Sequence, residues 1–236
     1  GSLGEAVEAK HRARSGLSQH AYDDPGGRAL PALLSALAAR FRLVHELLAP
    51  HGTLYVHCDT RLDALLRLVL DEIFGPQRFR NSIAWCYRGG GTPAVDFAHK
   101  HDTILRYSKS EKPYFDLDAV RIPYSDDVAN SHPSRIDKSY RKNAVYSGYK
   151  PHPGGKHPED WWPLQPLMPS DKRERLGYPT QKPEALLERI VLASCPPDGT
   201  VADFYCGSGT SLAVAARLGR RFIGCDLSAL AVHTTR

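Results

Sequence analysis

A short stretch near the end of the chain, Ala202–Thr210 (ADFYCGSGT), combines a carboxylate, two glycines two positions apart and two hydroxyls. The apolar segment 200–204 predicts a strand before it, and the apolar segment 211–218 predicts a helix after it. A second predicted strand, 221–226, ends in Asp226. Glycine lets the backbone approach a ligand closely, and a helix start offers free N–H groups. A carboxylate after the second strand can accept both ribose hydroxyls, so the unit suits an adenosine-containing cofactor.

The details of this loop separate three cofactor classes. A dinucleotide fold requires G-x-G-x-x-G, and the third glycine is absent from 207–212. A phosphate-binding loop requires a lysine after the glycines, and none follows here. Asp203 would repel a pyrophosphate and attract a cation such as the amino group of a methionine moiety, so the chemistry favours S-adenosylmethionine. For the loop alone, a glycine turn without a ligand stays open as the alternative.

The composition fits one large domain, or one domain with an insertion: 236 residues, 42% hydrophobic, with a net charge of +5. No apolar run is long enough to cross a membrane and no secretion signal opens the chain, so we expect a cytoplasmic protein. The five cysteines form no C-x-x-C pair, which predicts free thiols and no metal centre. The mildly basic charge permits binding to nucleic acid.

The hydrophobic pattern upstream of the loop predicts an α/β fold. Residues 1–27 lack periodicity and are interpreted as loop. The predicted elements are helices at 30–48, 62–73 and 183–191 and strands at 53–57, 82–87 and 103–107. We expect Asp59 or Thr60 to cap the second helix.

Residues 108–177 differ from the rest of the chain, because they are polar and rich in Pro, Tyr, Lys, Arg and His. A long irregular stretch inside a compact domain is more often a functional insertion than a plain connection. Its aromatic and cationic side chains, such as Tyr140, Arg141 and Lys142, suit contacts with phosphates and bases. A small irregular subdomain with solvated charges is the alternative interpretation.

A second motif, Gly177–Pro183 (GYPTQKP), lies upstream of Asp203. With it, the chain resembles the amino-group DNA methyltransferases that modify adenine N6 or cytosine N4, in the class whose catalytic motif precedes the cofactor motif. The cofactor motif of that family is similar to D-P-F-x-G-S-G-T, which this chain matches except at Phe204 and Tyr205. The resemblance covers residues 22–110 and 158–232, including the segments 54–59, 71–75 and 101–105.

The resemblance implies a Rossmann-like α/β sheet with a target-recognition insertion, S-adenosylmethionine as cofactor and double-stranded DNA as partner. The implied cofactor-binding residues are Asp203, Phe204, Gly207, Gly209 and Thr210 in the loop, Asp226 at the ribose, and Thr180, Gln181 and Lys182 at the methionine end. A capped, proline-started helix would explain Thr180 and Pro183 without a ligand. His57 and Asp59, at a strand end facing the cleft, are interpreted as structural.

The implied organisation has four parts: a loop remnant (1–27), the first part of the methyltransferase domain (28–109), the target-recognition insertion (110–176) and the cofactor-binding part (177–236). The family holds the target amine with a [DNS]-P-P-[YFW] tetrapeptide, and the chain has no such tetrapeptide. In the family order that motif would precede Tyr22. We therefore expect a fragment or a decayed enzyme that lacks one central strand, exposes two strand edges and carries no catalytic residue.

The sequence thus predicts a site-specific DNA methyltransferase of the restriction-modification type, and this chain alone is expected to be inactive. The alternative is a catalytically incomplete remnant that binds DNA and cofactor and needs a partner chain with the missing motif. A nicotinamide-dependent enzyme is a third interpretation, which the absent third glycine disfavours. The sequence does not assign adenine or cytosine, the recognised site or a restriction partner.

Overall fold

The computed structural model describes residues 30–89, 91, 93–124 and 152–235. Its elements in chain order are α2 (Leu30–Leu47), β1 (Thr53–Cys58), α3 (Asp63–Phe74), η1 (Pro76–Arg78), β2 (Phe79–Cys86), β3 (His101–Ser108), η2 (Asp118–Val120), β4 (Trp161–Pro163), α5 (Glu184–Ser194), β5 (Thr200–Asp203), α6 (Thr210–Arg217), β6 (Arg221–Gly224) and α7 (Ala229–Thr235). The predicted α/β class is confirmed, and each predicted helix and strand forms. The cysteines are all free thiols, and no helix in the described part is long and apolar enough to cross a membrane.

The strands form two separate sheets. Four of them pair in the order β1-β3-β2-β4, and β5 pairs with β6 alone. Strand β3 runs antiparallel to β1 and β2, whereas β4 is parallel to β2 and β5 is parallel to β6. Among the described residues, β1 and β5 therefore each have one edge without a strand partner. The central strand that the sequence predicts to be absent would lie between these two edges, and its absence stays a prediction.

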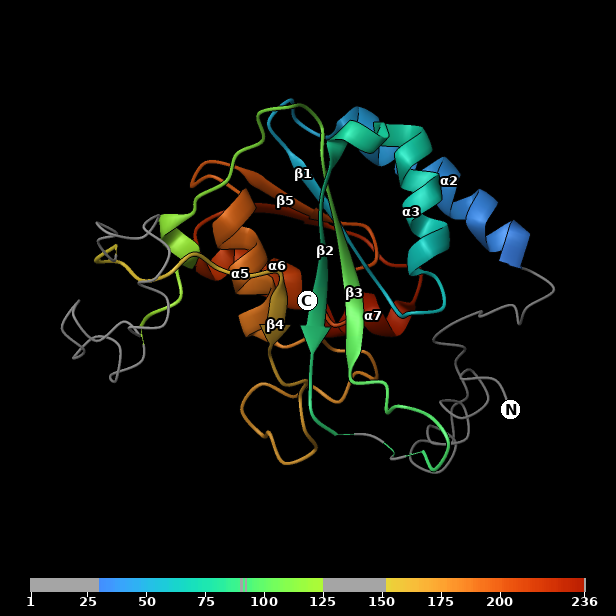
Figure 1. Cartoon of the computed structure of the whole chain (residues 1–236), viewed down its shortest axis with the longest axis vertical. Helices are drawn as coiled ribbons and strands as arrows, with labels where there is room; N and C mark the ends of the chain where they lie inside the picture. The colour runs from blue at the N-terminus through green and yellow to red at the C-terminus, as the bar shows by residue number, and fades with distance from the viewer. Residues whose placement is uncertain (1–29, 90, 92, 125–151, 236) are drawn as a thin grey trace, which may run out of the picture.

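The four-stranded sheet is covered on both faces, with α2 and α3 on one side and α5 on the other, and α6 packs against α5 beside the β5–β6 pair (Figure 1). Alternate residues of β3 face the two helix layers, since side chains point to opposite faces along a strand. Leu105 and Tyr107 pack with α2 and α3, and Ile104 packs with Leu186 of α5. The β5–β6 pair is less covered, because all four residues of β6 are exposed. Parallel strands are normally buried on both faces, so this pair depends on its neighbours for stability.

Helix α3 begins later than predicted. Its N-cap position is Leu62, which makes no side-chain capping bond, so the prediction of Asp59 or Thr60 as the cap was wrong. The Asp59 carboxylate instead accepts hydrogen bonds from the backbone N–H and the guanidinium of Arg61. The Asp59 carboxylate is thus engaged by Arg61 and does not cap the helix.

One strand and one α-helix, besides the two short 3-10 helices η1 and η2, were not predicted from the sequence. The short strand β4 lies inside the predicted insertion 110–176, where Trp161 is the register partner of Ala84 in β2. Helix α7 follows β6 at the end of the chain. Much of the predicted insertion, including Tyr140, Arg141 and Lys142, lies outside the described residues, as does 1–27. The proposed division into parts therefore stays a prediction.

Candidate functional site

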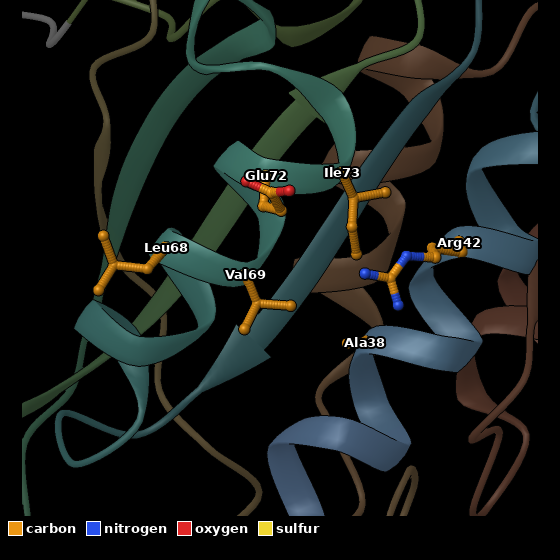
Figure 2. Close-up of a pocket in the computed structure, with 6 residues that line it drawn as sticks. All are labelled: Ala38, Arg42, Leu68, Val69, Glu72 and Ile73. Atoms are coloured by element: carbon orange, nitrogen blue, oxygen red, sulfur yellow. The ribbon is translucent and has the colours of Figure 1, made fainter. Parts of the chain in front are cut away.

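A groove between two helices is the first candidate for a ligand site. It lies between α2 and α3 and is lined by Ala38, Arg42, Leu68, Val69, Glu72 and Ile73. Figure 2 shows Arg42 extending from α2 toward α3. None of these residues belongs to the predicted cofactor-binding set, and the lining is mostly apolar side chains of two packed helices. The glycine loop is therefore the stronger candidate for the functional site.

The glycine loop connects β5 to α6, and its two glycines have backbone conformations that favour glycine. Gly207 has φ 52° and Gly209 has φ 79°, both in the left-handed region. A Cβ on Gly207 would lie 3.2 Å from the ring of Tyr178, and one on Gly209 would lie 2.6 Å from Cγ2 of Thr235. The loop therefore needs glycine at both positions for its conformation and for the close approach of its neighbours.

The carboxylate of Asp203 fixes the start of this loop. It accepts the backbone N–H of Tyr205 at 3.0 Å and the hydroxyl of Ser211 in the first turn of α6. The hydroxyl of Thr210 lies 3.0 Å from that of Ser208, and both side chains are buried. Asp203 and Thr210 thus sit in the loop as predicted, and their side chains already stabilise its turn into the helix.

The carboxylate of Asp226 holds the middle of the loop from the end of β6. One oxygen accepts the N–H of Gly207 at 2.9 Å, and the other accepts the N–H of Ser228 at 2.9 Å. An ionised carboxylate has about four acceptor positions, so two remain for further donors such as ribose hydroxyls. Asp226 therefore holds the loop, a role that the sequence did not indicate, and still has acceptor positions for the predicted contact with a ribose.

The second motif lies against the glycine loop. The ring of Tyr178 faces Gly207, and the ammonium of Lys182 is close enough to Asp203 for the two charges to interact. That ammonium also lies 5.9 Å from the ring centroid of Trp85 in β2 and donates to the carbonyl of Thr180. The structure thus brings one end of the second motif, the glycine loop and the four-stranded sheet together.

Gln181 makes two hydrogen bonds within its own segment. Its amide oxygen accepts the N–H of Leu176 and its amide nitrogen donates to the carbonyl of Glu174, both at 2.8 Å. These bonds lie within residues 174–181 and hold the segment that precedes α5 in one conformation. Gln181 as a cofactor contact stays a prediction, and its contacts in the structure are those of a loop-stabilising residue.

A polar cluster that was not predicted from the sequence lies beside Lys182. The Nε2 atom of His57, at the end of β1, lies 3.0 Å from a carboxylate oxygen of Asp102. The hydroxyl of Tyr87 donates to the other oxygen at 3.2 Å, and the rings of His57 and Trp85 are 5.6 Å apart. His57 was interpreted as structural, and its side chain is 32% exposed. These side chains meet only because β1, β2 and β3 pair in this register, so the spacing of the residues in the sequence does not predict the cluster.

The charges in this cluster shift one another's protonation. Burial lowers the pKa of His57, the positive charge of Lys182 lowers it further, and Asp102 opposes both. Burial also lowers the pKa of Lys182, against the effect of Asp102 and Asp203. Burial and the charge of Asp102 raise the pKa of Tyr87, so its phenol keeps its proton. The lowered pKa of His57 therefore favours a neutral imidazole at neutral pH.

The donor groups of the site suit an organic ligand better than a metal ion. Within the part of the chain that the structure describes, no three His, Cys, Asp or Glu side chains are arranged to hold a metal ion. The site offers carboxylates, an ammonium and close backbone, which match a ligand with hydroxyls and both signs of charge.

Comparison with known proteins identifies a family. The family model N6_N4_Mtase, described as DNA methylase, matches residues 25–235. Type II methyltransferase M1.MboII of Moraxella bovis is 37% identical over 64% of this chain and 58% of its own length. DNA adenine methyltransferase YhdJ of Escherichia coli (strain K12) is 33% identical over 78% of this chain and 59% of its own length. The chain thus spans less than two thirds of the length of these curated relatives.

A solved structure shares the fold. The crystal structure of the M1.HpyAVI–SAM complex superposes with a TM-score of 0.58 and covers 85% of this chain and 80% of that one. The sequence identity is 18%, so this likeness shows the fold alone.

The electrostatic coupling of His57 can be tested by two substitutions with opposite expected effects. Asp102→Asn removes the negative charge that favours the imidazolium, so the pKa of His57 should fall further below its ordinary value. Lys182→Gln removes a positive charge that disfavours it, so the pKa of His57 should rise. NMR titration of the histidine ring protons measures both, with His45, which packs on Phe74, as the unaffected control. Shifts of His57 in the same direction in both variants would contradict the proposed geometry.

Proposed function

Because the chain belongs to the N6_N4_Mtase family of DNA methylases, we propose that it takes part in site-specific methyl transfer to double-stranded DNA. The donor is S-adenosylmethionine, and the acceptor is an exocyclic amine, N6 of adenine or N4 of cytosine. When bound, the cofactor would supply an electrophilic methyl group on its sulfonium. The process belongs in the cytoplasm, where the protein meets DNA.

The observation that carries this proposal is the fixed glycine loop between β5 and α6. Gly207 is held by the carboxylate of Asp226 at 2.9 Å, and a side chain at Gly209 would clash with Thr235. The loop therefore presents bare backbone next to a carboxylate that has acceptor positions left for ribose hydroxyls. M1.HpyAVI, which has the same fold, forms a crystalline complex with SAM, the same cofactor.

The charges near the loop fit the amino-acid end of this cofactor. Asp203 can accept an ammonium group through its remaining acceptor positions, and Lys182 lies close enough to pair with a carboxylate. A dinucleotide would bring two phosphates against Asp203, which is electrostatically unfavourable. The residues present therefore match a zwitterion with a ribose better than they match a pyrophosphate.

A second candidate function has an observation of its own. Strands β1 and β5 each have an unpaired edge in the described structure, and the chain contains no [DNS]-P-P-[YFW] tetrapeptide. An unpaired strand edge is a template for another strand. On this interpretation, the chain binds cofactor and DNA, and a partner chain or a restriction-system subunit supplies the strand that carries the missing motif. It differs from the first candidate in predicting no transfer by the chain alone.

Calorimetry tests the cofactor assignment. The chain should bind S-adenosylmethionine and not NAD, and Asp226→Ala should weaken binding at least about tenfold, because it removes charged hydrogen bonds to the loop and the ribose. Asp198→Ala is the matched control, since Asp198 is exposed in the turn before β5. Binding of NAD, or equal losses in both variants, would count against the proposal.

A labelled-methyl assay on unmethylated double-stranded DNA separates the two candidate functions. The chain alone should transfer little methyl, because it has no [DNS]-P-P-[YFW] tetrapeptide to hold the target amine. Co-expression with a chain that carries a [DNS]-P-P-[YFW] segment should restore transfer for the native chain and not for Asp226→Ala. Robust turnover by the chain alone would refute the incomplete-enzyme interpretation.

A further inference from the structure

The loop between β2 and β3 carries two strongly exposed apolar side chains. Phe97 is 98% exposed and Val95 is 90% exposed. Single exposed apolar residues are common on proteins. Two of them side by side at the tip of one loop form a small apolar patch that no other part of the described chain covers. Burial of these two side chains would therefore yield hydrophobic free energy only when a group outside the described residues covers them.

The neck of this loop is anchored. The N–H of Tyr87 donates to the carbonyl of Lys100 at 2.9 Å, and the Lys100 ammonium donates to the carbonyls of Gly89 and Gly91. The N–H of Arg88 donates to the side-chain oxygen of Gln165 at 3.0 Å, which ties the loop to the segment after β4. The apolar tip is thus presented from a fixed base.

The base of the loop adjoins the cofactor site. Tyr87 donates to Asp102, whose other oxygen lies next to His57, and Trp85 lies beneath the ammonium of Lys182. That ammonium is in turn within the electrostatic range of Asp203 in the glycine loop. In Figure 1 the loop leaves the sheet at the edge where the arrowheads of β2 and β4 end. The tip therefore projects from the same edge of the sheet as the polar cluster beside Lys182.

The charges around the tip favour one kind of partner. Arg88, His99 and His101 are exposed on the flanks of the loop, and Asp96 is the acidic residue between Val95 and Phe97. The Arg88 guanidinium on one flank suits a phosphate of a nucleic acid, the imidazoles of His99 and His101 can hydrogen-bond to it, and an aromatic tip suits the faces of its bases. A protein partner would use the apolar tip but would gain less from the Arg88 guanidinium.

We propose that Phe97, with Val95 beside it, is a wedge that enters the base stack of duplex DNA next to the target base. Apolar wedges partly unstack a base step, which lowers the cost of extruding a neighbouring nucleotide. This inference rests on the proposed function, because the wedge is useful only if a base must leave the duplex. It assigns a DNA contact to a loop outside the predicted insertion 110–176.

A tryptophan placed at the tip reports insertion directly. The full chain carrying Phe97→Trp is mixed with an intact duplex and with the same duplex containing one abasic site, and its emission is compared with that of the native chain. Stacking against bases should quench the added indole, more strongly on the abasic duplex, where unstacking costs less. Leu68→Trp on α3, at a site 68% exposed, is the matched control and should not respond.

Affinity gives the second readout. By fluorescence anisotropy, Phe97→Ala should weaken duplex binding by about tenfold, as expected for the loss of one stacking contact, and Leu68→Ala should not change it. If the native chain binds both duplexes while the Phe97→Trp emission and the Phe97→Ala affinity are unchanged, the wedge is wrong and the proposed function stands. If the native chain binds neither duplex, both the proposed function and the wedge fail.

Discussion

The carboxylate of Asp226 is the constraint on which the functional end of the molecule depends. It ties the N–H of Gly207, in the loop after β5, to the end of β6, and it also orders the turn into α7 through Ser228. Bonds of this kind to an ionised acceptor are stronger than bonds between neutral groups. With Gly207 fixed, α6 can begin at Thr210 and Tyr178 can lie against the loop. The carboxylate that we propose to bind the cofactor is therefore also the one that holds the local fold.

Helix α5 explains how a molecule with a divided sheet is held together. Leu186 packs with Ile83, Trp85 and Ile104 of the four-stranded sheet, whereas Val191 packs with Val214 of α6. At the end of α5, the hydroxyl of Ser194 lies 2.7 Å from that of Tyr55 in β1. At its start, Lys182 interacts with charges on both sides, Asp102 and Asp203. The helix joins the two sheets through side chains, since no strand pairing joins them in the described residues.

Much of the fold follows from hydrophobic periodicity, because long apolar stripes such as that of α2 leave few alternatives. Strand β4 was missed because three residues, Trp-Trp-Pro, carry no period, and its conformation comes from pairing with β2. The contact between His57 and Asp102 was missed because it joins residues 45 positions apart and depends on the register of β1 with β3. Motif matching did not indicate the local hydrogen bonds of Gln181 to Glu174 and Leu176, which decide where its amide points.

The glycine loop and the second motif should respond to S-adenosylmethionine as one site. Hydrogen exchange of the backbone amides, with and without the cofactor, tests this most directly. We expect S-adenosylmethionine to slow exchange in 203–210 and in 178–183 together, with no change in α3, whose residues face the other side of the sheet. Protection of only one of the two segments, or of neither, would show that they do not form a shared cofactor site.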